Sequence, residues 1–439
     1  MDYIVNTDQE QQEMLAALGL SSLEDLYKDV PEGAKLKRKL NLPEGVSEFE
    51  AYDALKSLAL QDKVYPVIFR GAGCYRHRIP AAVRAITSLP GFVTAYTPYQ
   101  AEISQGILAG MFEFQTMIAD LTGLDVANAS VYDGCEAAAE AMIMCLDPRH
   151  MRMLVSAAIN PEVLKVLKTY AHSQGAELVM IPVRDGVTDL AALNDLLDDA
   201  TACVYSENPN YYGNLEDVSA LAAAAHAKNV KVITGVNPTT LALVRTPGEC
   251  GSDIAVGDGQ SLGLDLNFGG PTTGFMATRT ALMRKLPGRI VGQTADRNGS
   301  RCFVLTLQAR EQHIRREKAS SSICSNQALC AFRNTVYLAA LGKEGFREMS
   351  EQCLTLAHLA AAKITALLGY SLAYPQQEFF LEFAVKTPVP VSRINEVLDA
   401  HGILGGLELA EKEMLVCVTE ANSEAQIETL VNLLKEVQA

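Results

Sequence analysis

Residues 153–182 read MLVSAAINPEVLKVLKTYAHSQGAELVMIP, and this stretch indicates the fold class. Two short, nearly continuous apolar runs, Met153–Ser156 and Glu177–Pro182, flank a segment of helical character, Pro161–Ser173. Apolar runs bounded by turn residues are typical of strands in a parallel sheet that is covered on both faces. The stretch therefore predicts a strand–helix–strand unit of an α/β domain, joined by a right-handed crossover.

The same alternation extends from about residue 105 to residue 330. The further helices expected there are Ile107–Thr122, Cys135–Cys145 and Asp217–Lys228, and the further strands are Ala202–Ser206, Lys231–Thr234, Ile254–Val256 and Gly274–Thr278. After residue 330 the pattern becomes that of a small α+β region, with helices at Gln352–Leu368, Val391–His401 and Ser423–Val437 and apolar segments at Glu378–Val385 and Met414–Val418.

The chain of 439 residues is too long for one small core, so we expect a large main domain with smaller parts. We expect residues 1–60 to form a helical arm that packs onto the larger body. Thr7 with Glu10 makes a capping-box pattern at its first expected helix, Thr7–Leu18. The predicted domains are the arm at 1–60, the large α/β domain at 61–330 and the small α+β domain at 331–439.

Net charge and cysteine usage narrow the partners and the compartment. The net charge of −15 argues against nucleic acid or an anionic membrane as a partner, since both need a basic surface. No apolar run is long enough to span a bilayer. The 10 cysteines stand singly, without a C-x-x-C pair, and the N-terminus is polar and acidic. Reduced thiols in the cytoplasm fit this pattern best.

Residues 94–106 read TAYTPYQAEISQG, a run rich in hydrogen-bonding side chains. The run has neither the 3.6-residue period of a helix nor the alternation of a strand, and Pro98 argues against a helix through it. Loops carry binding residues more often than other segments do. A binding loop and a polar surface loop that caps the next helix are about equally favoured by the run itself.

The remaining motifs mainly exclude classes of functional site. The seven histidines are scattered without metal-ligand spacing, so no metal site is expected, and P-loop and G-x-S-x-G patterns are missing. The basic turn at residues 75–78 could bind an anion, although a solvated turn is the more favoured reading. The turn at Gly134 opens an alanine-rich helix and would suit a phosphate, but Glu136 would repel one. No lysine occurs between Lys231 and Lys285.

Several of these pieces together resemble the P-protein family of the glycine cleavage system, and within it subunit 1 of the two-subunit bacterial form. The resemblance runs nearly from end to end. It is carried by YIVNT at the start, GAGCYRHRIP at 71–80, TAYTPYQAEISQG at 94–106, FEFQTMIADLTGLDVANAS at 112–130 and SICSNQAL at 322–329.

The resemblance implies an aspartate-aminotransferase-like large domain, the fold type I of pyridoxal-phosphate enzymes, with a smaller α+β C-terminal domain. It also implies decarboxylation of glycine and transfer of the aminomethyl group to the lipoyl arm of H-protein. That chemistry needs a lysine in the turn after a strand, and the corresponding place, near Gln260 and Ser261, has none. Asn237 stands where the family's catalytic subunits place a carboxylate. Ser322 also departs from its relatives, which commonly have Asn there.

We therefore expect no cofactor in this chain and a vestigial pocket around Gly134, Glu136, Asn237, Gln260 and Ser261. Pyridoxal phosphate would be bound by a homologous subunit 2, in a heterotetramer of two copies of each subunit. Active sites of this fold lie at subunit interfaces, so this chain would line the partner's site. The candidate residues are Tyr96, Tyr99, Gln100, Glu102, Gly73 and Tyr75. A non-catalytic scaffold for subunit 2 and, less favoured, a standalone aminotransferase-like enzyme are the alternatives.

Overall fold

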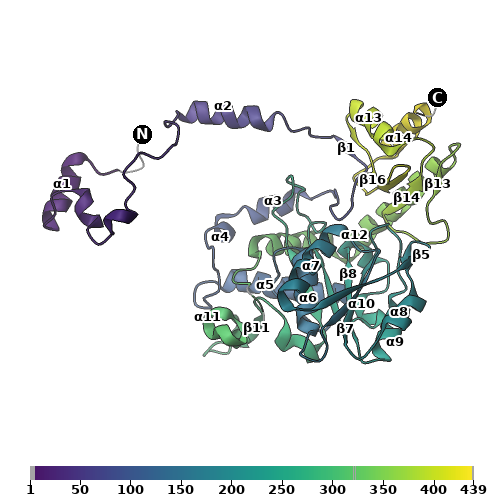
Figure 1. Cartoon of the computed structure of the whole chain (residues 1–439), viewed down its shortest axis with the longest axis horizontal. Coiled ribbons are helices and arrows are strands. Elements are labelled where there is room, and N and C mark those ends of the chain that lie inside the picture. Colours follow the sequence, from purple (N-terminus) through teal and green to yellow (C-terminus); the bar gives the residue numbers. More distant parts are fainter. Residues whose placement is uncertain (1–4, 320, 322, 438–439) are drawn as a thin grey trace. The chain divides into compact units, whose positions relative to one another are not determined.

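The computed structural model describes residues 5–319, 321 and 323–437 (Figure 1). The departure predicted at Ser322 lies outside the described residues. The chain divides into two compact units between Val64 and Tyr65.

The first unit consists of short helices that are stabilised by their caps. Helix α1 (Asp8–Ala17) begins with the predicted capping box, in which Thr7 and Glu10 satisfy each other's backbone N–H groups. A second capping box, of Ser47 and Glu50, begins α2 (Glu48–Ala59). Leu15 is the buried residue of α1, and no residue of α2 is buried. Local hydrogen bonds therefore contribute more to these helices than burial does.

A mixed seven-stranded sheet forms the centre of the second unit (Figure 1). The strands, in spatial order, are β2 (Val126–Ala127), β10 (Gly274–Thr278), β9 (Ile254–Asp258), β8 (Lys231–Val236), β7 (Thr201–Asn208), β3 (Arg152–Ser156) and β4 (Glu177–Ile181). The expected strands are confirmed, and β4, β3, β7, β8 and β9 run parallel.

The parallel arrangement that the apolar strands predict ends at one edge of the sheet. Strand β10 pairs antiparallel with both β9 and β2. A parallel partner needs a crossover, usually through a helix, and residues 259–273 between β9 and β10 contain none. The chain therefore turns back beside the strand that it has just left.

Helices cover both faces of this sheet, as its apolar strands predict. Alternate residues of β3 point to opposite faces, so that Met153 and Val155 join one core cluster while Leu154 joins another. The first cluster contains α6 (Gly134–Cys145) and α7 (Pro161–Gln174), and the second contains α8 (Leu190–Leu196) and α9 (Val218–His226). The alanines of α6 are fully buried, and their small size lets the helix lie close to the strands.

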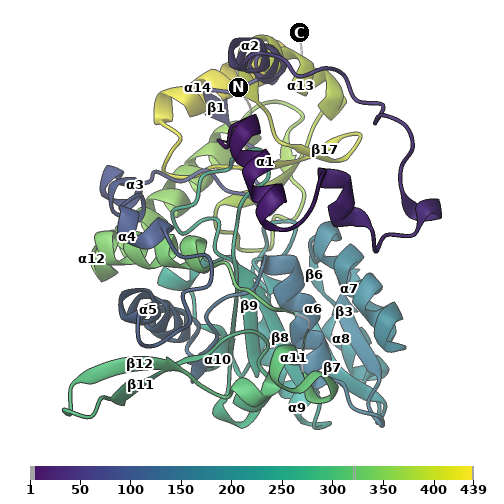
Figure 2. The same ribbon diagram turned by 90° about the vertical axis from the view of Figure 1, so that its left-hand side faces the viewer.

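A third cluster joins α5 (Gln105–Thr122) and α12 (Ala328–Thr365) to the β10 edge of the sheet. Helix α12 begins far earlier than the predicted Gln352, although its helical geometry is interrupted at Gly342. The charged and glycine-containing residues around this break hide the helical period in the sequence. Figure 2 shows the β11–β12 hairpin (Val291–Ala295 and Arg301–Leu305) projecting beyond α5.

The C-terminal part packs an antiparallel sheet against helices around its own core. The order of the strands is β13 (Ser371–Leu372), β14 (Glu382–Lys386), β17 (Glu413–Cys417) and β16 (Leu407–Ala410), and the helices are α13 (Val391–Ala400) and α14 (Glu424–Glu436). The predicted helices of this region are confirmed. The segment 65–68 reaches this part through β1 (Val67–Ile68), which pairs with β15 (Ile403–Leu404).

The remaining described elements are short. They are α3 (Ala81–Thr87), α4 (Pro90–Val93), α10 (Pro247–Cys250), α11 (Gln312–Arg315), β5 (Val183–Arg184) and β6 (Val187–Thr188), besides several 3₁₀ turns. Within the described part of the chain, no helix combines the length and the apolar character that crossing a bilayer requires.

Candidate functional site

A cavity of about 150 Å³ opens where β7, β8 and β9 end. The carboxyl ends of parallel strands are the usual place for ligand sites in α/β folds. Six residues that the sequence singled out line this cavity: Gly73, Tyr75, Gly134, Asn237, Gln260 and Ser261. The structure thus brings together residues from four distant parts of the chain, and the cavity is smaller than the roughly 300–1,000 Å³ of most small-molecule pockets.

The N-terminus of α6 faces this cavity, and its N–H groups already bind carboxylates. The Asp133 carboxylate accepts a hydrogen bond from the Glu136 N–H (2.7 Å), and the Glu136 carboxylate accepts one from the Tyr132 N–H (2.9 Å). The Gly134 N–H donates to the Asp258 carboxylate (3.0 Å). The N–H groups of Gly134 and Glu136 lie in the first turn of α6, where a helix N-terminus would otherwise hold an anion.

Burial raises the pKa of two of these three carboxyl groups, Glu136 and Asp258. Burial raises the pKa of Glu136 to about 7, the hydrogen bond from the Tyr132 N–H acts in the opposite direction, and the neighbouring Glu140 and Asp133 raise it further. The pKa of Asp258 is also raised, first by burial. The sequence pointed to Glu136 but missed the contributions of Asp133 and Asp258. Asp133 could have been found from its position directly before the helix, whereas Asp258 lies more than a hundred residues away along the chain.

The other predicted pocket residues hold the loops that surround the cavity. Gln260 makes two hydrogen bonds with the backbone of Tyr75: its side-chain oxygen accepts from the Tyr75 N–H (2.8 Å), and its amide donates to the Tyr75 carbonyl (2.9 Å). The Asn237 side-chain oxygen accepts from the Thr239 N–H (3.1 Å) and from the Ser261 hydroxyl (3.4 Å). These side chains therefore stabilise the strand ends and the 71–75 loop.

Two carboxylates that the sequence did not reveal, the buried Glu382 and the half-buried Glu207, complete the wall. Glu382 accepts hydrogen bonds from the Ala72 N–H (2.6 Å) and the Tyr75 hydroxyl (2.7 Å), while Glu207 accepts from the Asn160 N–H (2.8 Å) and from Tyr205. Burial raises the pKa of each carboxyl to about 7, against the opposing effect of these hydrogen bonds. No motif marks either residue: Glu382 lies between Leu381 and Phe383 on β14, and Glu207 lies between Ser206 and Asn208 at the end of β7.

Together these groups do not fit a phosphate-bearing cofactor. Glu207, Asp258 and Glu382 line the cavity, and among the described residues that form its wall there is no lysine, arginine or histidine. The wall therefore offers neither a positive charge for a phosphate nor an amine for a Schiff base. Its carboxylates would repel an anion.

The four candidates of the 94–106 loop do not line this cavity. Tyr96 has 88% of its surface exposed, and Gln100 and Glu102 are exposed as well. Tyr99 is partly buried: its hydroxyl donates to the Asn326 side chain (2.7 Å), and the Arg289 guanidinium lies 4.4 Å from its ring centre. The loop is irregular until α5 begins at Gln105.

Tyr99 therefore fastens the loop to the body, and the other three side chains remain available on the surface. Two groups of predicted residues can be distinguished: Gly73, Tyr75, Gly134, Asn237, Gln260 and Ser261 line the chain's own cavity, and Tyr96, Gln100 and Glu102 face outward. Tyr99 and Glu136 belong to neither group.

Comparison with known proteins identifies the family of the chain. A family model described as glycine cleavage system P-protein matches residues 1–434. Over the full length of both chains, the sequence is 47% identical to a protein of Moorella thermoacetica and 45% identical to one of Desulfitobacterium hafniense. Both relatives are named probable glycine dehydrogenase (decarboxylating) subunit 1.

Comparison with solved structures supports the same family and shows the fold. The chain superposes with a TM-score of 0.93, at 41% identity and over all of both chains, on a crystal structure of glycine decarboxylase (P-protein) of the glycine cleavage system in inhibitor-bound form. A sphingosine-1-phosphate lyase of Burkholderia pseudomallei shares the fold at 17% identity, with a TM-score of 0.67 over 93% of this chain and 94% of that one. The predicted fold type I of pyridoxal-phosphate enzymes is confirmed.

Proposed function

Since the chain belongs to the glycine cleavage system P-protein family, we propose that it acts as subunit 1 of a two-subunit glycine dehydrogenase (decarboxylating). With subunit 2 it would release CO2 from glycine and transfer the remaining aminomethyl group to the lipoyl arm of H-protein. The observation that carries this proposal is full-length identity of 45–47% to proteins named as subunit 1.

The chemistry of the cavity supports a division of labour between the subunits. Its wall has carboxylates where a phosphate would need N–H groups and positive charge, and it offers no amine. Pyridoxal phosphate and its lysine would therefore belong to subunit 2. In this proposal two copies of each chain form a heterotetramer.

The exposed side chains of the 94–106 loop are the groups that this chain would contribute. Tyr96, Gln100 and Glu102 lie free on the surface of the isolated chain, while Tyr99 anchors the loop through Asn326. We assign these exposed side chains to the wall of the partner's active site, where phenol, amide and carboxylate groups can orient a small amino acid. Gly73 and Tyr75 shape this chain's own cavity.

The ten cysteines of the described chain are free thiols. This supports a reducing compartment, and we propose the cytoplasm.

The reaction is tested by mixing the purified chain with subunit 2, H-protein and pyridoxal phosphate and measuring exchange of labelled bicarbonate into glycine. Full exchange should require both subunits. Tyr96→Phe and Glu102→Gln should lower the exchange rate without preventing assembly, whereas Glu408→Gln, at an exposed position on β16, should leave it unchanged. Full-rate exchange by subunit 2 alone would refute an active-site role.

The scaffold alternative makes a different prediction. If the chain only stabilises subunit 2, both loop variants would keep full exchange, and only substitutions that disrupt assembly would reduce it. The standalone-enzyme alternative requires the isolated chain to show the visible absorption of a lysine-bound cofactor.

A further inference from the structure

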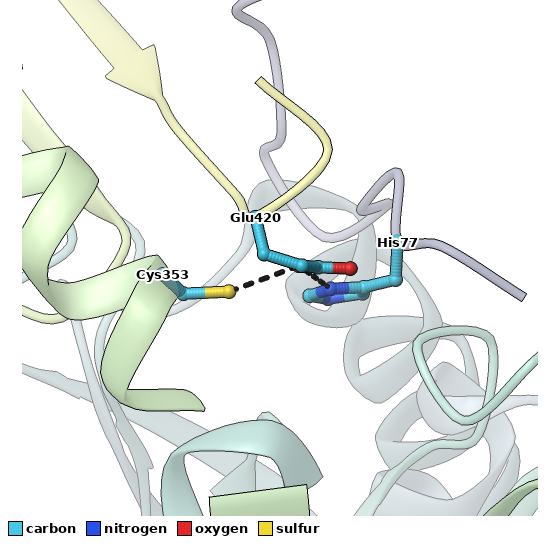
Figure 3. A group of neighbouring side chains, drawn as sticks. All are labelled: His77, Cys353 and Glu420. Carbon is cyan, nitrogen blue, oxygen red and sulfur yellow. Dashed lines mark hydrogen bonds and ion pairs between the residues drawn. The ribbon is translucent and has the colours of Figure 1, made fainter. Parts of the chain in front are cut away.

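Three side chains from distant parts of the chain meet in the interior, away from the cavity wall (Figure 3). His77 lies in the loop between β1 and α3, Cys353 lies on α12, and Glu420 follows β17. One potential ligand atom from each residue falls within 4.8 Å of the others. Glu420 is central: its carboxylate accepts hydrogen bonds from His77 Nδ1 (2.8 Å), the Cys353 thiol (3.1 Å) and the Arg78 N–H (2.7 Å).

The three side chains are buried, and not all of their polar atoms have a hydrogen-bond partner among the described residues. The side chains of His77 and Glu420 are only 2% and 5% exposed, and Cys353 is fully buried. With Nδ1 turned to Glu420, the other ring nitrogen of His77, Nε2, has no hydrogen-bond partner among the described residues. Buried polar atoms nearly always have a partner, so the imidazole of His77 is incompletely satisfied, while its Nδ1 is the nitrogen that faces the Glu420 carboxylate.

A second unsatisfied atom lies in the same region. The Tyr337 hydroxyl, also on α12, is buried without a hydrogen-bond partner in the described part of the chain. Tyr337 and Cys353 belong to the same hydrophobic cluster of buried residues. A water molecule bound to a metal ion would give this hydroxyl a partner.

We propose that His77, Cys353 and Glu420 bind one Zn²⁺ ion, with water in the fourth position. Imidazole nitrogen, thiolate sulfur and carboxylate oxygen are the ligands that Zn²⁺ takes in proteins, at about 2.0–2.3 Å. Tetrahedral ligands at these distances are about 3.3–3.7 Å apart, so the O–N and O–S separations of 2.8 and 3.1 Å need to open by less than about 1 Å.

Charge balance favours a divalent ion. On binding, the Cys353 thiol loses its proton to solvent, and the thiolate and carboxylate neutralise the two charges of the ion. A neutral buried site avoids the desolvation cost of an unpaired charge.

The role that we infer for the ion is structural. It would connect the 71–80 loop, α12 and the segment after β17, which are distant in sequence. Because His77 lies two residues after Tyr75, the ion would also hold the loop whose residues line the cavity. This inference does not depend on the proposed function.

The test compares metal binding by the full-length chain and its variants. The chelator-treated protein, kept reduced, is titrated with Zn²⁺ and, separately, with Co²⁺, whose absorption reports a thiolate ligand. The wild-type chain should bind one Zn²⁺, release one proton and show thiolate-to-cobalt absorption. Cys353→Ser, which keeps a hydroxyl donor for Glu420, should lose this absorption and bind Zn²⁺ more than about 100-fold more weakly, beyond the 10–100-fold cost of outer-shell changes.

Cys330→Ala serves as the matched control, because Cys330 is a buried cysteine of the same helix outside the group. It should bind both metals like the wild-type chain. His77→Gln should weaken Zn²⁺ binding as well, which provides a second variant if Cys353→Ser does not fold. The proposal is overturned if the wild-type chain takes up no stoichiometric Zn²⁺, or if Cys353→Ser retains the thiolate absorption.

Discussion

Replacing Glu382 with glutamine should flatten the dependence of stability on pH. This carboxyl is 6% exposed and accepts hydrogen bonds from the Ala72 N–H and the Tyr75 hydroxyl. Burial raises its pKa from 4.5 to about 7, against the effect of the two hydrogen bonds. Glutamine has nearly the same shape and can still accept a hydrogen bond, but it has no proton to lose.

The direction of this pH effect follows from the pKa of Glu382 in the unfolded chain and in the folded chain. Between pH 4.5 and about 7 the unfolded chain has lost the Glu382 proton while the folded chain keeps it, so raising the pH favours unfolding. The contribution of Glu382 to the free energy of unfolding is fully present below about pH 4.5 and is lost as the pH rises through about 7. At about 1.4 kcal/mol for each pH unit between the pKa values, the loss is about 3 kcal/mol.

The measurement is urea unfolding of the wild-type chain and of Glu382→Gln at about pH 5 and about pH 8. The wild-type chain should lose about 2.5 kcal/mol more stability than the variant between these conditions, because part of the change already lies below pH 5. Glu136 and Glu207, whose pKa values burial also raises to about 7, should leave part of the slope in both proteins. Comparing the two slopes removes any constant effect of the substitution.

Glu408→Gln tests whether the charge change alone matters, because Glu408 is exposed on β16 of the same sheet. Its pH dependence should match that of the wild-type chain. Equal losses of stability in the wild-type chain and in Glu382→Gln would show that Glu382 ionises normally in the folded protein and would refute the reasoning.

Two further predictions concern stability. Asp133→Ala removes the cap that accepts the Glu136 N–H and should lower the free energy of unfolding by about 1 kcal/mol in urea, whereas asparagine should largely preserve it; equal stability of all three proteins would contradict the cap. Gly213→Ala should cost at least about 3 kcal/mol, because φ is +86° and a Cβ would lie 2.1 Å from the Glu382 carbonyl. At Gly299, where φ is +80° without a neighbour within 4 Å, the same change should cost only about 1–2 kcal/mol in thermal melts, and equal costs at both sites would exclude the steric explanation.

Much of the fold could be predicted because helix and strand signals are local. The Thr7–Glu10 capping box and the alternation through residues 153–182 depend on neighbours only a few positions apart, and the structure confirms both. The direction of β10 could have been inferred from the missing helix after β9. The start of α12 could not, since the helix continues beyond a break at Gly342 through packing rather than through a clear period.

The candidate site was only partly predictable. Glu136 and the absence of a lysine near Gln260 are readable directly, because residue type alone carries the chemical information. Which groups share one cavity is not readable, since Glu207 and Glu382 have no local pattern and reach the wall through strand pairing. The 94–106 loop was a reasonable candidate, but only the structure separates the anchoring Tyr99 from the exposed Tyr96.

The α/β class, the family resemblance and the absence of a lysine between Lys231 and Lys285 can all be read from the order of residues along the chain, because each is a property of that order. The contact of Asp258 with the N–H of Gly134 and the convergence of His77, Cys353 and Glu420 arise only when the chain folds. Such contacts join residues that lie between 67 and 343 positions apart in the chain. They depend on how strands pair and helices pack, and the chemistry of a buried site follows from those neighbours.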